Sequence, residues 1–324
     1  MPRLTRRTLF LGAAAAPFAA PMAQAQSWPS RPIKIIVPFP PGGTVDPIAR
    51  LAQPTLQQRL GVPVVIENKP GASGSIGAAL VAKSPPDGNT WLFVFDTQAV
   101  NPFLQDLPFD TVRDLDPVLL IGTAPNVLCK NPARPYETPA QLFEAAKAKP
   151  ESISFASVGS GSLGHLTMTL LTQKAGVRMI HAPYRGGGPA MNDAIAGHVD
   201  LIIGSAALIS PQAAAKKIIP ILQTGKTRLA SMPQTQTAID AGFAGFESYA
   251  WWGVFAPAGT PRTIIERFGA ELADALRVEN VARQLRDNLS INLLLEGPEA
   301  ERDFLATQMA LWGPVVRENN IKGE

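Results

Sequence analysis

The chain has 324 residues, of which 46% are hydrophobic, and this length and balance predict a globular protein with room for two lobes. Its 29 basic residues exceed its 26 acidic residues by three, and Arg3, Arg6 and Arg7 lie in the first 25 residues. The rest of the chain is therefore formally neutral, and no basic patch supports a nucleic-acid partner. Cys129 is the only cysteine, and the three histidines lack a zinc-binding spacing, so we expect neither a metal nor a cofactor.

Residues 1–25 are typical of an export signal peptide. Arg3 and Arg6-Arg7 form a basic start, residues 9–18 form an apolar stretch, and Ala23-Gln24-Ala25 fits a cleavage site. The apolar stretch is shorter than the roughly 20 residues that a membrane-spanning helix needs. The paired arginines fit a twin-arginine signal or a general secretory signal, and both predict a periplasmic mature protein.

Short apolar runs rich in valine and isoleucine alternate with segments of helical periodicity. This alternation predicts an α/β fold with mostly parallel sheets. The runs occupy residues 33–37, 64–66, 91–95, 118–120, 127–129, 153–156, 201–204, 218–222 and 252–255. After residue 261 the pattern is helical over 263–276, 279–285 and 298–319, and we expect these helices to pack onto one lobe.

Two glycine-rich turns follow the first two apolar runs, at Pro40-Pro41-Gly42-Gly43-Thr44 and at residues 68–74. Turns of this kind lie at the carboxyl ends of strands, where α/β proteins bind ligands. Backbone N–H groups at the helix starts that follow favour negative charge, so the turns predict an anion site. Asp46, which precedes Pro47, is interpreted as a helix cap or as a partner for a donor group of the ligand.

A third glycine-rich turn, at residues 157–165, allows several interpretations. It contains a G-x-G-x-x-G pattern, but no acidic residue ends a strand about 20 residues later, which disfavours a dinucleotide site. Ser160 or Ser162 could be the nucleophile of an exported hydrolase, although the G-x-S-x-G pattern fails at Ser162. Either serine could instead cap the following helix and share its N–H groups with an anion.

A fourth turn follows at Tyr184-Arg185-Gly186-Gly187-Gly188-Pro189. The guanidinium of Arg185 could hold a carboxylate through two parallel hydrogen bonds. It could equally point to solvent or reach across the lobes, and the sequence leaves these alternatives open.

Together these motifs resemble the Bug family of solute-binding proteins, also called the TctC receptors of tripartite tricarboxylate transporters. The resemblance covers essentially the whole chain after the export signal, and the fixed order of the motifs makes it specific. The matching segments are Trp28-Pro29-Ser30-Arg31-Pro32-Ile33, Pro38-Phe39-Pro40-Pro41-Gly42-Gly43 with Asp46, Glu67-Asn68-Lys69-Pro70-Gly71-Ala72 with Gly74, Pro86-Asp87-Gly88, Asn101-Pro102, Pro125-Asn126-Val127-Leu128, Ser160-Gly161-Ser162, Tyr184-Arg185-Gly186-Gly187-Gly188-Pro189-Ala190, Gly197-His198-Val199-Asp200, Ala256-Pro257-Ala258-Gly259-Thr260-Pro261 and Trp312.

The resemblance implies a two-lobed periplasmic binding protein with its ligand cleft between the lobes. Residues 28–126 and 250–324 would form the first lobe, and residues 127–249 the second. The protein would be a monomeric, non-enzymatic receptor that closes on a small carboxylate and delivers it to the membrane permease subunits of a tripartite tricarboxylate transporter. A receptor that serves a signalling partner is the alternative within the same fold. The implied ligand-binding residues are Phe39, Gly42, Gly43, Thr44, Asp46, Gly71, Ala72, Ser73, Thr97, Gln98, Ser157, Ser160, Gly161, Ser162, Tyr184, Arg185 and Ser205.

Two positions depart from the family pattern. Val45 stands where many relatives carry a hydroxyl, and because prolines have no N–H, the first turn keeps Gly42, Gly43 and Thr44 as its donors. Ser205-Ala206-Ala207 replaces a turn that is more polar in many relatives. The identity of the carboxylate therefore stays open.

Overall fold

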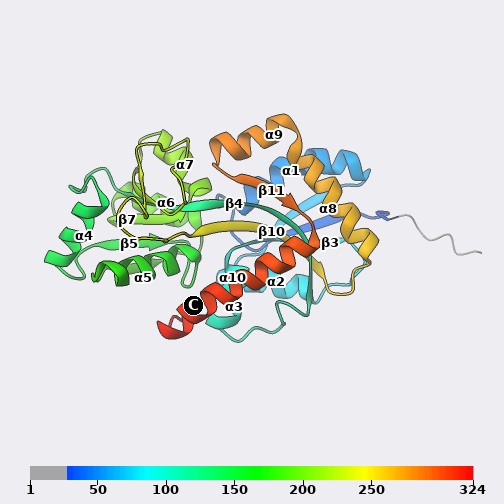
Figure 1. Cartoon of the computed structure of the whole chain (residues 1–324). Coiled ribbons are helices and arrows are strands. Elements are labelled where there is room, and N and C mark those ends of the chain that lie inside the picture. Colours follow the sequence, from blue (N-terminus) through cyan, green and yellow to red (C-terminus); the bar gives the residue numbers. More distant parts are fainter. Residues whose placement is uncertain (1–27, 324) are drawn as a thin grey trace, which may run out of the picture.

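A computed structural model describes residues 28–323, and the predicted export signal lies outside the described residues. The strands form one mixed sheet in the order β2-β1-β3-β10-β4-β7-β5-β6, with β11 and β8 also paired to β4 and β9 paired to β8. The sheet has two parts that share the long central strand β4 (Leu115–Lys130) (Figure 1). The pairs toward both ends of the sheet are parallel, whereas β4 and β10 in the middle pair antiparallel.

We call the two parts sheet A and sheet B. Sheet A contains the start of β4 together with β1 (Ile33–Val37), β2 (Val64–Asn68), β3 (Thr90–Phe95), β10 (Tyr249–Pro257) and β11 (Asn292–Glu296). Sheet B contains the end of β4 together with β5 (Ser154–Ser157), β6 (Ile180–Pro183), β7 (Leu201–Ser205), β8 (Ile219–Gln223) and β9 (Gln236–Thr237).

Helices cover both parts of the sheet (Figure 1). Those beside sheet A are α1 (Val45–Leu60), α2 (Ser75–Ala82), α3 (Thr97–Leu104), α8 (Arg262–Arg277), α9 (Glu279–Arg283) and α10 (Pro298–Glu318), with a 3-10 turn η1 (Ala72–Gly74) and a π-helical turn η2 (Gln284–Asn288). Those beside sheet B are α4 (Pro139–Ala148), α5 (Leu163–Ala175), α6 (Gly187–Ala196) and α7 (Ala206–Ala214). None of the helices in residues 28–323 is long and apolar enough to cross a membrane.

Strand β4 corrects one expectation from the sequence. The apolar runs at 118–120 and 127–129 were expected to be separate strands. The structure instead has one strand of 16 residues, almost all of them buried. Its pairing with β10 shifts register between Leu120 and Gly122 and between Pro117 and Leu119, and stays regular at Pro125. One strand therefore pairs with β10 in sheet A and with β7 in sheet B. The lobe boundaries at 126/127 and 249/250 stay a prediction.

The C-terminal helix α10 reaches further than expected. It was predicted to pack onto one lobe, and it lies along sheet A, but its C-terminal part also contacts α5 beside sheet B (Figure 1). Trp312 and Val316 of α10 pack with Leu163 and Leu166 of α5 and with the end of α3 in one apolar cluster. This cluster therefore joins the two sides of the molecule at a distance from the shared strands.

Candidate functional site

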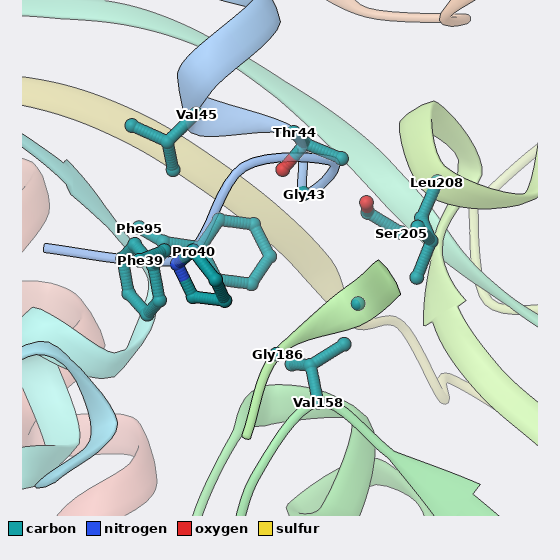
Figure 2. Close-up of a pocket in the computed structure, with 11 residues that line it drawn as sticks. Phe39, Pro40, Gly43, Thr44, Val45, Phe95, Val158, Gly186, Ser205 and Leu208 are labelled. Carbon is teal, nitrogen blue, oxygen red and sulfur yellow. The ribbon is translucent and has the colours of Figure 1, made fainter. Parts of the chain in front are cut away.

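A cavity lies between the two sides of the molecule, at the carboxyl ends of β1, β3, β5 and β7. Its volume is about 30 Å³, room for about two or three water molecules. Figure 2 shows the cavity with its lining side chains. The lining residues are Phe39, Pro40, Gly43, Thr44, Val45, Phe95, Val158, Gly186, Gly187, Ser205 and Leu208. Of these, Phe39, Gly43, Thr44 and Ser205 were predicted site residues.

Three helices begin at this cavity. Their N-cap residues are Thr44 for α1, Gly186 for α6 and Ser205 for α7, and all three line the cavity. None of these residues uses its side chain to cap its own helix. Helix N-termini carry partial positive charge and unpaired N–H groups, so three of them directed at one cavity favour an anion.

Two hydroxyl groups face the cavity from opposite sides (Figure 2). Thr44 Oγ1 accepts a hydrogen bond of 2.9 Å from the indole Nε1 of Trp252, which leaves the Thr44 hydroxyl hydrogen to donate elsewhere. Ser205 is only 3% exposed, and its Oγ has no hydrogen-bond partner within residues 28–323. A buried hydroxyl without a partner costs stability, so Ser205 is suited to bind a ligand atom.

The remaining walls of the cavity are apolar. The rings of Phe39 and Phe95 meet edge to face with their centroids 6.1 Å apart, and Val45, Val158 and Leu208 complete the surface. None of the described residues that line the cavity is charged. Backbone N–H groups and the two hydroxyls must therefore provide the attraction for an anion.

A wider outer groove continues from the cavity. It shares Gly43, Thr44 and Leu208 with the cavity and has a volume of about 470 Å³. Its lining residues are Pro41, Gly42, Gly43, Thr44, Pro47, Gly188, Pro189, Met191, Asn192, Ala207, Leu208, Pro211, Gln212 and Leu289. Leu208 thus borders both the cavity and the outer groove.

Asp46 lies behind the first glycine turn and has a structural role. Its carboxylate accepts hydrogen bonds of 2.9 Å from Arg50 Nε and 3.0 Å from Asn68 Nδ2. These bonds tie the start of α1 to the end of β2, and Asp46 does not line the cavity. The predicted Gly42 lies in the outer groove.

The second glycine turn contacts the opposite side of the molecule. The hydroxyl of Ser73 donates to the backbone oxygen of Ser160 at 3.4 Å, and Asn101 Nδ2 donates to the backbone oxygen of Ser73 at 3.1 Å. Gly71, Ala72 and Ser73 thus lie where sheet A meets the third glycine turn, outside the lining of the cavity.

Thr97 and Gln98 are buried at the start of α3 and do not line the cavity. The preceding residue, Asp96, is fully buried, and burial raises the pKa of its carboxyl well above the usual range. The nearby backbone N–H groups of Leu163 and Thr97 partly offset this rise in pKa. Because Leu163 begins α5, Asp96 lies close to the sheet B side.

The third glycine turn contains no nucleophile and base directed at the cavity. The Ser160 hydroxyl donates to the backbone oxygen of Lys322, and Ser162 caps α5 through the N–H of His165. Ser157 Oγ lies 2.7 Å from His181 Nε2, but Ser157 is fully buried. Gly161, in the same turn, donates its N–H to His165 Nδ1 at 3.0 Å.

The two histidines beside this turn stack with ring centroids 3.7 Å apart. Burial lowers the pKa of His165 to about 4, and burial together with the neighbouring His165 lowers the pKa of His181 to about 3. Sequence analysis missed this pair, because the two residues lie on different elements and only the pairing of β5 with β6 brings them together.

The fourth turn contributes backbone rather than side chains to the cavity. The Tyr184 hydroxyl donates to Asp193 Oδ2 at 2.7 Å, and Arg185 is exposed and lines neither the cavity nor the outer groove. Gly186 and Gly187 line the cavity instead. A Cβ at Gly186 would lie 3.0 Å from the ring of Pro40, so glycine permits the close approach of the two turns.

The fold is that of a periplasmic binding protein. The solved structure of the periplasmic binding protein BugD is similar to this chain with a TM-score of 0.85 and 29% identity, over 91% of this chain and 99% of that chain. A structure of Rpa4515 from R. palustris with adipate matches with a TM-score of 0.86 and 30% identity, over the same shares. A curated relative, the UPF0065 protein in the tcbD-tcbE intergenic region of Pseudomonas sp. (strain P51), is 38% identical over 91% of this chain and 88% of its own length.

Residues 48–321 match the model of the TctC family, described as the tripartite tricarboxylate transporter family receptor. The chain therefore belongs to the TctC family, whose members are receptors and not enzymes. The family predicted from the sequence motifs is confirmed.

Proposed function

We propose that this protein is an exported receptor that captures a small carboxylate between two lobes and delivers it to the permease subunits of a tripartite tricarboxylate transporter. The observation that carries the proposal is the Ser205 hydroxyl, which has no hydrogen-bond partner within residues 28–323 and is buried at a cavity where the N-termini of α1, α6 and α7 meet. These groups donate hydrogen bonds and favour negative charge. The relative Rpa4515, solved with adipate, supports a carboxylate as the anion.

Closure of the two lobes would bring together the two hydroxyl groups that line the cavity. Thr44 belongs to the sheet A side and Ser205 to the sheet B side, so the two hydroxyls approach one anion only when the sides are together. A ligand that bridges them stabilises the closed arrangement by its differential affinity for it. The contact of Ser73 with Ser160 would break on opening.

The first experiment is a search for the ligand. Native mass spectrometry of gently purified protein identifies any retained metabolite, and a thermal-shift screen then tests a wide panel of carboxylates. A ligand at a hundredfold excess over its Kd stabilises the folded state by about 2.7 kcal/mol. We expect at least one carboxylate to raise the melting temperature with saturation and without turnover. If no carboxylate binds, or if a bound ester or amide is hydrolysed, the proposal is wrong.

Delivery to a permease needs a separate measurement. Uptake of the labelled ligand by cells is expected to fall when the receptor gene is deleted and to recover when the intact chain is supplied. Unchanged uptake, with a ligand-dependent change in the activity of a sensor kinase, would instead support the signalling alternative.

A further inference from the structure

We propose that Leu208 selects ligands by the bulk of the carbon next to the bound carboxyl, so that the receptor takes carboxylates with an unbranched methylene group at that position. The inference rests on the proposed function and names a residue that determines its specificity. The size of the cavity and the position of Leu208 at the start of α7 carry it.

The cavity has room for a carboxyl group and little more. Its volume of about 30 Å³ corresponds to about two or three water molecules, which is the size of one carbon with two oxygens. The N-termini of α1, α6 and α7 and the hydroxyls of Thr44 and Ser205 favour the anionic end of a ligand at this place. The rest of the ligand therefore needs adjoining space, and the outer groove of about 470 Å³ offers it.

Leu208 has the largest side chain that borders both spaces. The described residues that line the cavity as well as the outer groove are Gly43, Thr44 and Leu208. Gly43 has no side chain, and Thr44 Oγ1 is held by the indole of Trp252. A ligand body that continues from the cavity into the groove therefore passes the side chain of Leu208.

The geometry of α7 places Leu208 next to the bound carboxyl. Ser205 is the N-cap residue of α7 and Leu208 follows three positions later, so the two side chains lie on the same side of the first turn. Side chains of an α-helix tilt toward its N-terminus, which directs Leu208 toward Ser205, and both residues line the cavity (Figure 2). A carboxylate that accepts the Ser205 hydroxyl thus has its next carbon beside Leu208.

Two glycines allow the Leu208 side chain to pack tightly. A Cβ added at Gly187 would lie 2.9 Å from Leu208 Cδ1, and a Cβ added at Gly204 would lie 3.0 Å from Leu208 Cδ2. These distances are shorter than ordinary van der Waals contacts, so glycine at both positions lets Leu208 lie close to the start of α6 and the end of β7. A ligand that pushes Leu208 away must break these packing contacts.

A branch on the carbon next to the carboxyl would therefore collide with Leu208. A methylene group at that position contacts the leucine side chain and gains from leaving water. Two methyl groups at the same position add carbon atoms to a space that is already filled, and overpacking of this kind is unfavourable. We expect it to weaken binding by roughly tenfold or more.

The test compares acids of equal charge that differ in methyl groups on the carbon next to the carboxyl, using isothermal titration of the wild-type protein. The pairs are butyrate with 2,2-dimethylbutyrate, phenylacetate with 2-methyl-2-phenylpropanoate, and succinate with tetramethylsuccinate, which is methylated at both ends. We expect the methylated acid of each pair that binds to have a Kd at least about tenfold higher than its partner. The control ligand 2,2-dimethylsuccinate keeps one methylene end and is expected to bind nearer to succinate than to tetramethylsuccinate.

The outcomes separate this inference from the proposed function. Equal or tighter binding of the methylated acids overturns the inference and leaves the proposed function intact. The same holds if every carboxylate that raises the melting temperature lacks a methylene group next to its carboxyl. No binding of any carboxylate contradicts the proposed function itself.

A variant tests whether Leu208 is the residue responsible. Leu208→Ala makes room beside the carboxyl, and we expect it to lower the ratio of the two Kd values within each pair at least about fivefold. Leu289→Ala is the matched control, because Leu289 lines the outer groove but not the cavity, and it is expected to keep the wild-type ratio. Circular dichroism and melting temperature check that both variants fold. A folded Leu208→Ala protein that keeps the wild-type ratio, or that binds neither acid, contradicts the assignment of Leu208, and the wild-type pairs decide the ligand class independently of either variant.

Discussion

Replacing Ser205 by alanine is expected to weaken ligand binding without destabilising the unliganded protein. The Ser205 hydroxyl is buried, has no partner within residues 28–323 and does not cap α7, although it occupies the N-cap position. The substitution therefore removes a group that forms no hydrogen bond with the described residues. Ser210, on the same helix, is the matched control, because it is also buried but its Oγ lies 2.9 Å from Ser290 Oγ.

The magnitudes follow from these contacts. A hydrogen bond to a charged group contributes about 1.5–3 kcal/mol, so loss of the Ser205 hydroxyl is expected to raise the Kd for a carboxylate by roughly tenfold to a hundredfold. An unsatisfied buried polar group costs about 1–3 kcal/mol. The free energy of unfolding of the Ser205→Ala protein is therefore expected to equal that of the wild-type protein or to exceed it by up to about 2 kcal/mol. Ser210→Ala is expected to lose about 0.5–1.5 kcal/mol and to keep its affinity.

Two assays decide the outcome. Isothermal titration with the carboxylate that raises the melting temperature most gives the Kd, and denaturant unfolding without ligand gives the free energy of unfolding. An unchanged Kd for Ser205→Ala would refute the role of Ser205 as an anion donor. A loss of stability as large as that of Ser210→Ala would show that the Ser205 hydroxyl already has a partner in the unliganded protein.

Three further predictions concern the stability of the folded protein. Trp312→Ala removes the aromatic side chain of the cluster that joins α10, α3 and α5, and denaturant unfolding is expected to show a loss of about 3–5 kcal/mol in the free energy of unfolding. Leu311→Ala is the control, because the Leu311 side chain is 53% exposed, and it is expected to change the free energy of unfolding by less than about 0.5 kcal/mol. Burial raises the pKa of Glu301 well above its usual range, so the stability of the wild-type protein falls as the pH rises above the unfolded-state pKa of about 4.3. The Glu301→Gln protein is therefore expected to gain stability relative to wild type as the pH increases. A difference in the free energy of unfolding between the two proteins that does not change with pH would contradict this prediction. The pKa values of His165 and His181, lowered to about 4 and 3, predict that stability is lost as the pH falls below about 6.5, and replacing both by glutamine is expected to reduce that loss in acid unfolding curves.

The sequence predicted the parts of the site that lie in local motifs. A glycine turn after a strand has a recognisable pattern, so Gly43 and Thr44 were found, and Phe39 and Ser205 followed from the family resemblance. The α/β fold was predicted for the same reason, because alternating strands and helices leave a local signal in each segment. Strand β4 was divided in error, since its continuity depends on partners far away in the chain, and β6, β9 and β11 were not predicted.

The apolar part of the site had no local signal. Phe95, Val158 and Leu208 occur in ordinary apolar segments, and only the tertiary arrangement places them at one cavity. Their positions at or just after the ends of β3, β5 and β7 are the one sequence feature that selects them. The sequence could not predict the hydrogen bonds that Asp46 and Tyr184 form with other side chains. Whether a polar group is free to bind a ligand depends on the neighbours that the fold places beside it.

The most direct test of the central claim is a crystal structure of the protein with the carboxylate that raises its melting temperature most. The account predicts the carboxylate group between the N-termini of α1, α6 and α7, with its oxygens accepting hydrogen bonds from Thr44 Oγ1 and Ser205 Oγ. It also predicts the body of the ligand against Leu208. A carboxylate bound elsewhere, or bound through Arg185 with Ser205 still unpartnered, would contradict the account.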